Sequence, residues 1–152
     1  MIQNEYEINS KTNAIIGISK KGSIILEGER EIYSTHIPQE IIERNCEYGG
    51  STFNGRLKNS QLHLGKKYKL PIVISEIKET IMFPTKSYYD DTCCWISLNN
   101  IVKYEEVDKK VCIYFKEGKP QIFDISIETL EIGVLRASKL LLILKIRKKD
   151  EF

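Results

Sequence analysis

The chain has 152 residues, of which 41% are apolar and 29% are charged, and its formal net charge is +2. This length and composition fit one folded domain over residues 1–152, and they exclude disordered and collagen-like chains. The longest apolar run, Leu140 to Leu144, is far shorter than the ~18 residues of a membrane span, and the N-terminus lacks the apolar core of a secretory signal, so we expect a cytoplasmic protein with no membrane partner.

The first third of the chain predicts short β-strands followed by one helix. Runs rich in Ile and Tyr, with partial alternation of apolar and polar residues, cover residues 5–8, 14–19, 23–27 and 31–35. Lys20-Lys21-Gly22 predicts a hairpin turn, because glycine readily adopts the positive φ of such turns. Pro38 suits the first turn of a helix that we expect to end at Cys46 or Tyr48, before Gly49-Gly50.

The middle of the chain predicts a loop and then further strands. Residues 49–69 are the least regular segment, rich in Gly, Ser, Asn and Lys, and we expect a basic loop there. Strands follow at residues 71–75, 80–83, 95–104, 110–116 and 121–125, with Asn99-Asn100 as a candidate interruption of the third. Phe83 and Trp95 lie in apolar runs, so we expect both in the core, whereas Tyr88 and Tyr89 in the polar loop 86–92 should be exposed.

The C-terminal segment has the periodicity of a helix, which we expect at about residues 127–148. Ser126 can cap its N-terminus, and the basic residues from Lys145 to Lys149 suit the negative end of the helix dipole. Gly133 weakens the helix by about 1 kcal/mol relative to alanine. The predicted fold is therefore α+β: a curved, mostly antiparallel β-sheet of about seven to nine strands, one short internal helix and a C-terminal helix.

The sequence contains no recognisable catalytic or metal-binding motif. The cysteines are Cys46, Cys93, Cys94 and Cys112, and no two have the spacing that structural zinc sites favour. Phosphate-binding glycine loops, nucleophile elbows and zinc-protease motifs are also absent. A Cys–His dyad would need His36 or His63, and no pattern orients such a pair. We therefore expect a protein that is not an enzyme, with no catalytic residues, no cofactor and no metal.

Charge is unevenly distributed along the chain. Residues 48–75 contain no Asp or Glu, yet this window holds Arg56, Lys58, Lys66, Lys67 and Lys69. A flexible, glycine-flanked loop with an arginine at its tip can enter the narrow minor groove of DNA, where negative potential is concentrated. The alternative is a solvated basic loop with no partner, which the charge pattern alone leaves open.

Four blocks of residues carry a family resemblance. They are IIERNCEYGGSTFNGR (residues 41–56), LPIVIS (70–75), IMFPT (81–85) and CCWIS (93–97). In order and approximate spacing these blocks resemble the ComK family of competence transcription factors, with Cys46, Tyr48 and the pair Gly55-Arg56 at matching positions. Cys94 departs from a glycine of the family pattern, and the chain stops at Phe152, before the C-terminal tail of the family.

The resemblance implies a bacterial activator of DNA-uptake genes that binds AT-rich double-stranded DNA through the minor groove as a homo-oligomer. It also suggests RNA polymerase and a protease adaptor as partners, although the absent tail puts activation and adaptor-guided degradation in question. DNA contacts are then expected from the basic segment: Asn54, Gly55, Arg56, Lys58, Lys66, Lys67 and Lys69. The alternative is a shortened paralogue that binds a full-length relative through an apolar stripe of the C-terminal helix, ending in Leu140 to Leu144, without activating transcription.

Overall fold

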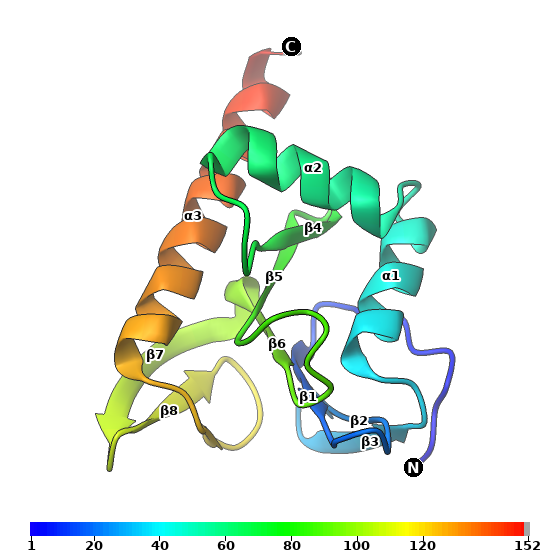
Figure 1. Cartoon of the computed structure of the whole chain (residues 1–152), viewed down its shortest axis with the longest axis vertical. Helices are drawn as coiled ribbons and strands as arrows, with labels where there is room; N and C mark the ends of the chain where they lie inside the picture. The colour runs from blue at the N-terminus through cyan, green and yellow to red at the C-terminus, as the bar shows by residue number, and fades with distance from the viewer. Residues whose placement is uncertain (151–152) are drawn as a thin grey trace.

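The computed structural model describes residues 1–150, which form three α-helices and nine β-strands (Figure 1). The helices are α1 (Pro38–Tyr48), α2 (Phe53–Leu64) and α3 (Ile127–Asp150). The strands are β1 (Thr12–Gly17), β2 (Ser23–Glu27), β3 (Arg30–Ser34), β4 (Ile72–Ser75), β5 (Thr80–Pro84), β6 (Cys94–Ser97), β7 (Ile101–Val107), β8 (Lys110–Phe115) and β9 (Gln121–Phe123). The expected α+β class is confirmed, and α2 is an additional internal helix. Within the described residues, no helix combines the length and the apolar character needed to cross a membrane.

The strands are antiparallel, as expected, and divide into two sheets. Six pair in the order β3-β2-β1-β6-β5-β4, and three pair in the order β7-β8-β9. A short 3-10 helix, Leu98–Asn100, lies at the expected interruption and divides the predicted strand 95–104 between the two sheets. The Asn100 amide nitrogen donates to the carbonyl oxygens of Ser10 and Thr12, each at 3.0 Å, and so fixes this corner.

Side chains that alternate along the six-stranded sheet build a core on each of its faces. Trp95 and Ile15 pack with residues of α1 and α2 on one face. Phe83 and Ile96 pack with β8 and α3 on the other. Trp95 and Ile96 are neighbours in β6 and point to opposite faces, as the two-residue period of a strand requires. Core packing of Phe83 and Trp95, which are 1% and 0% exposed, is therefore confirmed.

The helix α3 approaches β5 closely at Gly133. A Cβ atom at this position would lie 2.5 Å from Cδ2 of Phe83, so only glycine fits without a shift of the ring. The intrinsic cost of glycine in a helix, about 1 kcal/mol, is offset by this close packing. The expected C-terminal helix is confirmed, and the Ser126 hydroxyl caps it by accepting a 3.1 Å hydrogen bond from the Thr129 amide.

The prediction of a strand at residues 5–8 is wrong, because this segment pairs with a side chain of α1 instead of a strand. The Ile8 amide donates to Oδ1 of Asn45 at 2.8 Å, and Nδ2 of Asn45 donates to the Tyr6 carbonyl oxygen at 3.0 Å. Tyr6 and Ile8 are buried, which explains the apolar pattern of the segment without β-pairing.

The apolar stripe predicted on the C-terminal helix is also placed differently. Leu140 and Leu144 are 1% and 7% exposed and belong to the core beneath α3. The exposed apolar residues of α3 are instead Ile132, Leu135, Leu142 and Ile146.

Candidate nucleic-acid interface

The segment predicted as a basic loop is largely the helix α2, which lies between α1 and α3 (Figure 1). Thr52 sets its start, because the side-chain oxygen accepts a 2.9 Å hydrogen bond from the Gly55 amide. The helix ends at Gly65, which has a left-handed backbone with φ of 64°. The irregular part of the segment next to the lysines is therefore only residues 65–69, called here the lysine connection.

Arg56 lies in the first turn of α2 and not at the tip of a loop. Its side chain is 8% exposed, and Nη1 lies 2.8 Å from Oε1 of Glu76 in the turn between β4 and β5. Nη2 donates to the Gly49 carbonyl oxygen at 3.4 Å, and Nε is buried without a hydrogen-bond partner among the described residues. The guanidinium therefore holds α2 against this turn and does not face solvent.

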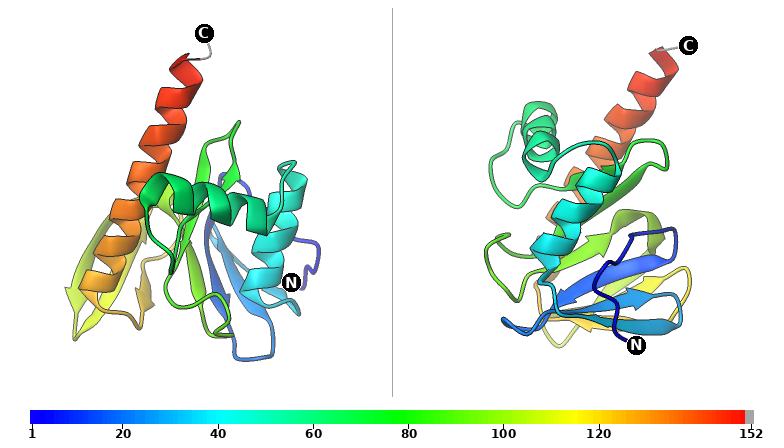
Figure 2. Two further views of the ribbon diagram at one scale, coloured as in Figure 1. Left: turned by 45° about the horizontal axis from the view of Figure 1, so that its top comes forward. Right: turned by 90° about the vertical axis from the view of Figure 1, so that its right-hand side faces the viewer.

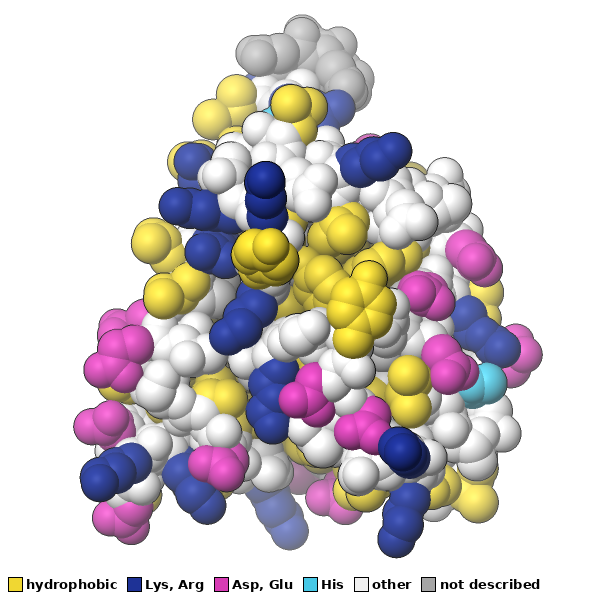
Figure 3. All heavy atoms as spheres, viewed as in Figure 1, with side chains coloured by type: hydrophobic (Ala, Val, Ile, Leu, Met, Phe, Trp, Pro, Cys, Tyr) yellow, Lys and Arg dark blue, Asp and Glu magenta, His cyan; other side chains and the backbone are white. Residues whose placement is uncertain are grey.

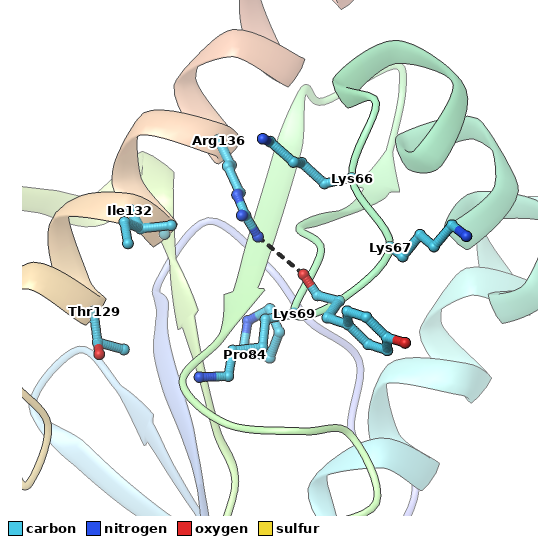
Figure 4. Close-up of a pocket in the computed structure, with 9 residues that line it drawn as sticks. Lys66, Lys67, Lys69, Pro84, Thr129, Ile132 and Arg136 are labelled. Carbon is cyan, nitrogen blue, oxygen red and sulfur yellow. Dashed lines mark hydrogen bonds between the residues drawn. The ribbon is translucent and has the colours of Figure 1, made fainter.

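Three of the predicted lysines line the same cavity as an arginine from α3, and of these the Lys67 side chain points away from Arg136 (Figure 4). Lys66, Lys67 and Lys69 line a cavity of about 280 Å³ together with Arg136 (Figure 4). Nη1 of Arg136 donates to the Tyr68 carbonyl oxygen at 2.9 Å, which fixes the lysine connection beside α3. Four cations around one cavity concentrate positive potential, and their donors suit phosphate oxygens. We call Lys66, Lys67, Lys69 and Arg136 the cation cluster.

Arg136 is a member of this cluster that the sequence does not predict as a site residue. It is separated from Tyr68 by 68 positions and comes to the lysine connection only because α3 packs against the sheet. The four blocks that carry the family resemblance end at Ser97, so they do not identify it either. Charge patterning along the chain cannot reveal a cluster that two distant segments share.

The remaining predicted site residues lie along α2. Asn54 and Gly55 are exposed in its first turn, and Lys58 is exposed one turn later. No acidic residue occupies this first turn, so the positive end of the helix dipole is not compensated there by a side chain of α2. A helix of this length spans about 18 Å, so Asn54 lies far from Lys66 and does not line the cavity.

Aromatic residues support the lysine connection and flank it. The Tyr88 hydroxyl accepts a 2.8 Å hydrogen bond from the Leu70 amide, and the Tyr88 ring stacks on Trp95 with centroids 5.8 Å apart. Tyr88 is half-buried against the core, so the prediction that this residue is exposed is wrong, and this burial raises the pKa of its hydroxyl. Tyr89 is 85% exposed, as expected, and Tyr68 is 79% exposed among the lysines. Figure 3 shows basic side chains beside exposed hydrophobic ones on this face.

The cysteines have the environment of packing residues. Burial raises the pKa of Cys46 to about 12 and that of Cys93 to about 11, so neither is a thiolate nucleophile near neutral pH. The Nδ1 atom of His36 lies 2.7 Å from a carboxylate oxygen of Glu40, within the same segment. No cluster of His, Cys, Asp and Glu suited to a metal ion occurs among the described residues.

Comparisons with known protein families and with named proteins find matches to this chain. A family profile described as "ComK protein" matches residues 3–149. A protein of Bacillus subtilis (strain 168) named "Competence transcription factor" is 27% identical over 137 residues, which cover 88% of this chain and 71% of the relative. No solved structure matches the chain significantly.

Proposed function

Because this chain belongs to the ComK family, we propose that it is a transcriptional regulator of competence genes that binds double-stranded DNA through the cation cluster and α2. The family is one of transcription factors and not of enzymes, which agrees with a surface built from cations instead of catalytic groups. We further propose that the protein activates transcription and prefers AT-rich sites, which it reads through the minor groove.

The single observation that carries this proposal is the cation cluster. Lys66, Lys67 and Lys69 come from an acid-free stretch of sequence, residues 48–75, and Arg136 joins them from α3. The hydrogen bond from Arg136 to the Tyr68 carbonyl limits the freedom of the lysine connection. A cluster that is already held in place loses less conformational entropy when it binds a phosphate backbone.

The surface offers different groups for contacts to the phosphate backbone of DNA and for contacts to its minor groove. The cation cluster would neutralise phosphates, and Lys58 together with the exposed first turn at Asn54 and Gly55 would extend the contact along α2. A lysine side chain is long enough to enter the narrow minor groove of AT-rich DNA, where the negative potential is strongest. We assign Arg56 the role of a positioning residue that holds α2, because its guanidinium is paired with Glu76.

Fluorescence anisotropy with labelled AT-rich and GC-rich duplexes of equal length, measured over a range of salt concentrations, tests the proposal. The double variant Lys66→Ala/Lys67→Ala should bind AT-rich DNA at least tenfold more weakly. Its slope of log affinity against log salt should fall by about 2, because each lost phosphate contact removes about one released counterion. Arg136→Ala should weaken binding similarly.

The matched control is Lys116→Ala/Lys119→Ala, which removes the same charge from exposed positions beyond β8. It should keep affinity close to that of the wild-type protein. Equal affinity of the wild-type protein and the Lys66→Ala/Lys67→Ala variant would overturn the assignment of the site. Equal affinity for both duplexes would overturn the preference for AT-rich DNA.

A second candidate function is binding to a full-length relative without activation of transcription. The exposed apolar residues of α3, among them Leu135 and Leu142, support it, because they offer a surface for another protein. A promoter-reporter assay in a host that lacks relatives separates the two functions. Strong activation by this protein alone would exclude the second candidate.

A further inference from the structure

Exposed aromatic side chains gather beside the cation cluster. Among the residues that the structure describes, three tyrosines are exposed, and the two most exposed are Tyr68 and Tyr89, at 79% and 85%. Tyr68 belongs to the lysine connection, and Tyr89 belongs to the loop between β5 and β6. In the right-hand view of Figure 2, this loop and the lysine connection lie on the same side of the molecule. Aromatic rings usually bury their large apolar area, so two exposed rings beside four cations need an explanation.

One hydrogen bond joins the two segments that carry these rings. The Tyr88 hydroxyl accepts it from the Leu70 amide at 2.8 Å. Leu70 follows Tyr68 by two positions, and Tyr88 directly precedes Tyr89. The rings of Tyr88 and Tyr89 have centroids 6.4 Å apart and an interplanar angle of 65°. Because Tyr88 also stacks on the fully buried Trp95, the support beneath the two exposed rings is anchored in the core.

The lysine connection is held in one shape around Tyr68. Nη1 of Arg136 donates to the Tyr68 carbonyl oxygen at 2.9 Å. Lys69 has a left-handed backbone with φ of 52°, which a residue with a side chain adopts only where its surroundings require it. Leu70, the next residue, is fully buried. The exposed Tyr68 side chain therefore stands on a fixed backbone, and a ligand that binds there orders few further torsions.

We propose that this face binds a single strand of nucleic acid, with phosphates on the cation cluster and unpaired bases stacked on Tyr68 and Tyr89. Proteins that bind single strands without reading their sequence combine cations along the backbone with aromatic rings beneath the bases. A duplex would use the cations alone, because its bases stack on one another and present only their edges in the grooves. This binding goes beyond the proposed recognition of duplex DNA and rests on it only for the phosphate contacts of the cation cluster.

The distribution of charge orients the strand on this face. Next to Tyr89, the Asp90 carboxylate accepts hydrogen bonds from the amide and the hydroxyl of Thr92, at 2.9 and 2.7 Å. The Asp91 carboxylate accepts a 2.8 Å hydrogen bond from the Lys20 amide. These carboxylates repel phosphates, whereas the cation cluster attracts them. We therefore expect the backbone of the strand over the lysine connection, with its bases turned towards the two rings.

Fluorescence anisotropy with a labelled oligo(dT) of about 15 nucleotides tests the proposal, because this strand pairs with no other and covers a typical single-strand site. The wild-type protein should bind it. Tyr68→Ala and Tyr89→Ala should each weaken binding about fivefold or more, as expected for the loss of one stacked base. Tyr68→Phe keeps the ring and should keep the affinity. The matched control is Tyr48→Ala, which removes a 52% exposed ring from α1 and should leave the affinity unchanged.

An AT-rich duplex, measured with the same variants, separates single-strand binding from the proposed function. The double variant Tyr68→Ala/Tyr89→Ala should bind the duplex within about twofold of the wild-type affinity, because a duplex offers no base face to a ring. A protein that binds oligo(dT) and no duplex would overturn the proposed function alone. A protein that binds the duplex and no single strand would overturn single-strand binding alone. An equal loss of both affinities in the double variant would also overturn it, because the rings would then act without unpaired bases.

A fluorescent base reports the stacking, and an RNA strand identifies the source of the ligand. 2-Aminopurine placed within oligo(dT) should lose fluorescence when the wild-type protein binds, and should keep it when the double variant binds at saturation. Unchanged fluorescence in the wild-type complex would overturn the stacking. Oligo(rU) of equal length is the second arm, since charge and stacking contacts are common to both kinds of strand. Binding of either strand supports the proposal, and the tighter one shows whether the natural ligand is DNA or RNA.

Discussion

Arg56 and Glu76 form an ion pair, 2.8 Å from Nη1 to Oε1, that joins the first turn of α2 to the turn between β4 and β5. The two side chains are unequally buried, at 8% and 51% exposed. A buried guanidinium is costly without a partner, whereas a half-exposed carboxylate is solvated in any case. The pair therefore stabilises the position of Arg56 more than that of Glu76, and its loss should loosen α2.

The first prediction concerns this pair. Glu76→Gln should lower the free energy of unfolding by about 1–2 kcal/mol, because Arg56 keeps only a neutral acceptor there. If Arg56 acts by positioning α2, the same variant should also bind DNA more weakly. Urea unfolding and anisotropy measure the two effects, with Glu47→Gln as a control that removes one negative charge from an exposed site on α1. Tighter DNA binding by Glu76→Gln would instead mean that Arg56 is released to contact DNA.

The second prediction concerns the contact between Gly133 and Phe83. Alanine has a higher helix propensity than glycine, yet Gly133→Ala should destabilise the protein by about 1–3 kcal/mol, because the added methyl group overpacks the core. Ser138→Ala, at an exposed position of the same helix, should be neutral or slightly stabilising. The melting temperatures of both variants, compared with that of the wild-type protein, test this prediction. A higher melting temperature for Gly133→Ala would show that Phe83 moves aside without cost.

The helices α1 and α3, which were predicted from the sequence, have strong local signals at their ends. Pro38 and Gly49 bracket α1, and Ser126 together with the 3.6-residue apolar spacing marks α3. The helix α2 was missed because the whole segment 49–69 is rich in Gly, Ser, Asn and Lys, although Phe53, Leu57 and Leu64 have helical spacing. Thr52 is the local signal that marks the start of this helix, because its side chain caps the first turn. The loop-like composition of the surrounding residues obscures that signal.

The site was only partly predictable, for a different reason. Lys66, Lys67 and Lys69 were identified from charge along the chain, and the structure brings them to one cavity. Arg136 could not be identified in this way, since its place beside Tyr68 depends on the packing of α3. The burial of Arg56 depends likewise on Glu76, which lies 20 positions away and outside the acid-free window. Contacts between distant segments are tertiary information that composition does not carry.

The third prediction concerns the support of the lysine connection. Tyr88→Phe keeps the stacking on Trp95 and removes the acceptor for the Leu70 amide. A part-buried amide left without its acceptor costs about 1–2 kcal/mol, so stability should fall by that amount. Hydrogen exchange should become faster at the Leu70 amide in particular. Tyr89→Phe, at an exposed ring, is the control and should leave both stability and exchange unchanged. An unaltered exchange rate at Leu70 in Tyr88→Phe would contradict this role of the hydroxyl.

The fourth prediction concerns pH. Oε1 of Glu79 lies 3.1 Å from Nζ of Lys145, and Oε2 lies 3.7 Å from Nζ of Lys148, so the turn after β4 is tied to α3. The hydrogen bond from Lys145, aided by the charges of both lysines, holds the pKa of Glu79 below its ordinary value of 4.5. The folded state therefore binds fewer protons here than the unfolded state. The stabilisation is fully present above the unfolded pKa and is lost as pH falls through the lower folded pKa.

Thermal unfolding at two pH values tests this linkage. Glu79→Gln should melt at a lower temperature than the wild-type protein at pH about 7, and the difference should be smaller at pH about 3, which lies below the unfolded pKa. High salt should shrink the neutral-pH difference as well, because the pair is near the surface. The control is Glu29→Gln, in the turn between β2 and β3, because the described residues give Glu29 itself no ion pair, whereas its neighbours Glu27 and Arg30 pair with each other. A deficit of Glu79→Gln that is equally large at both pH values would assign its effect to packing and not to charge.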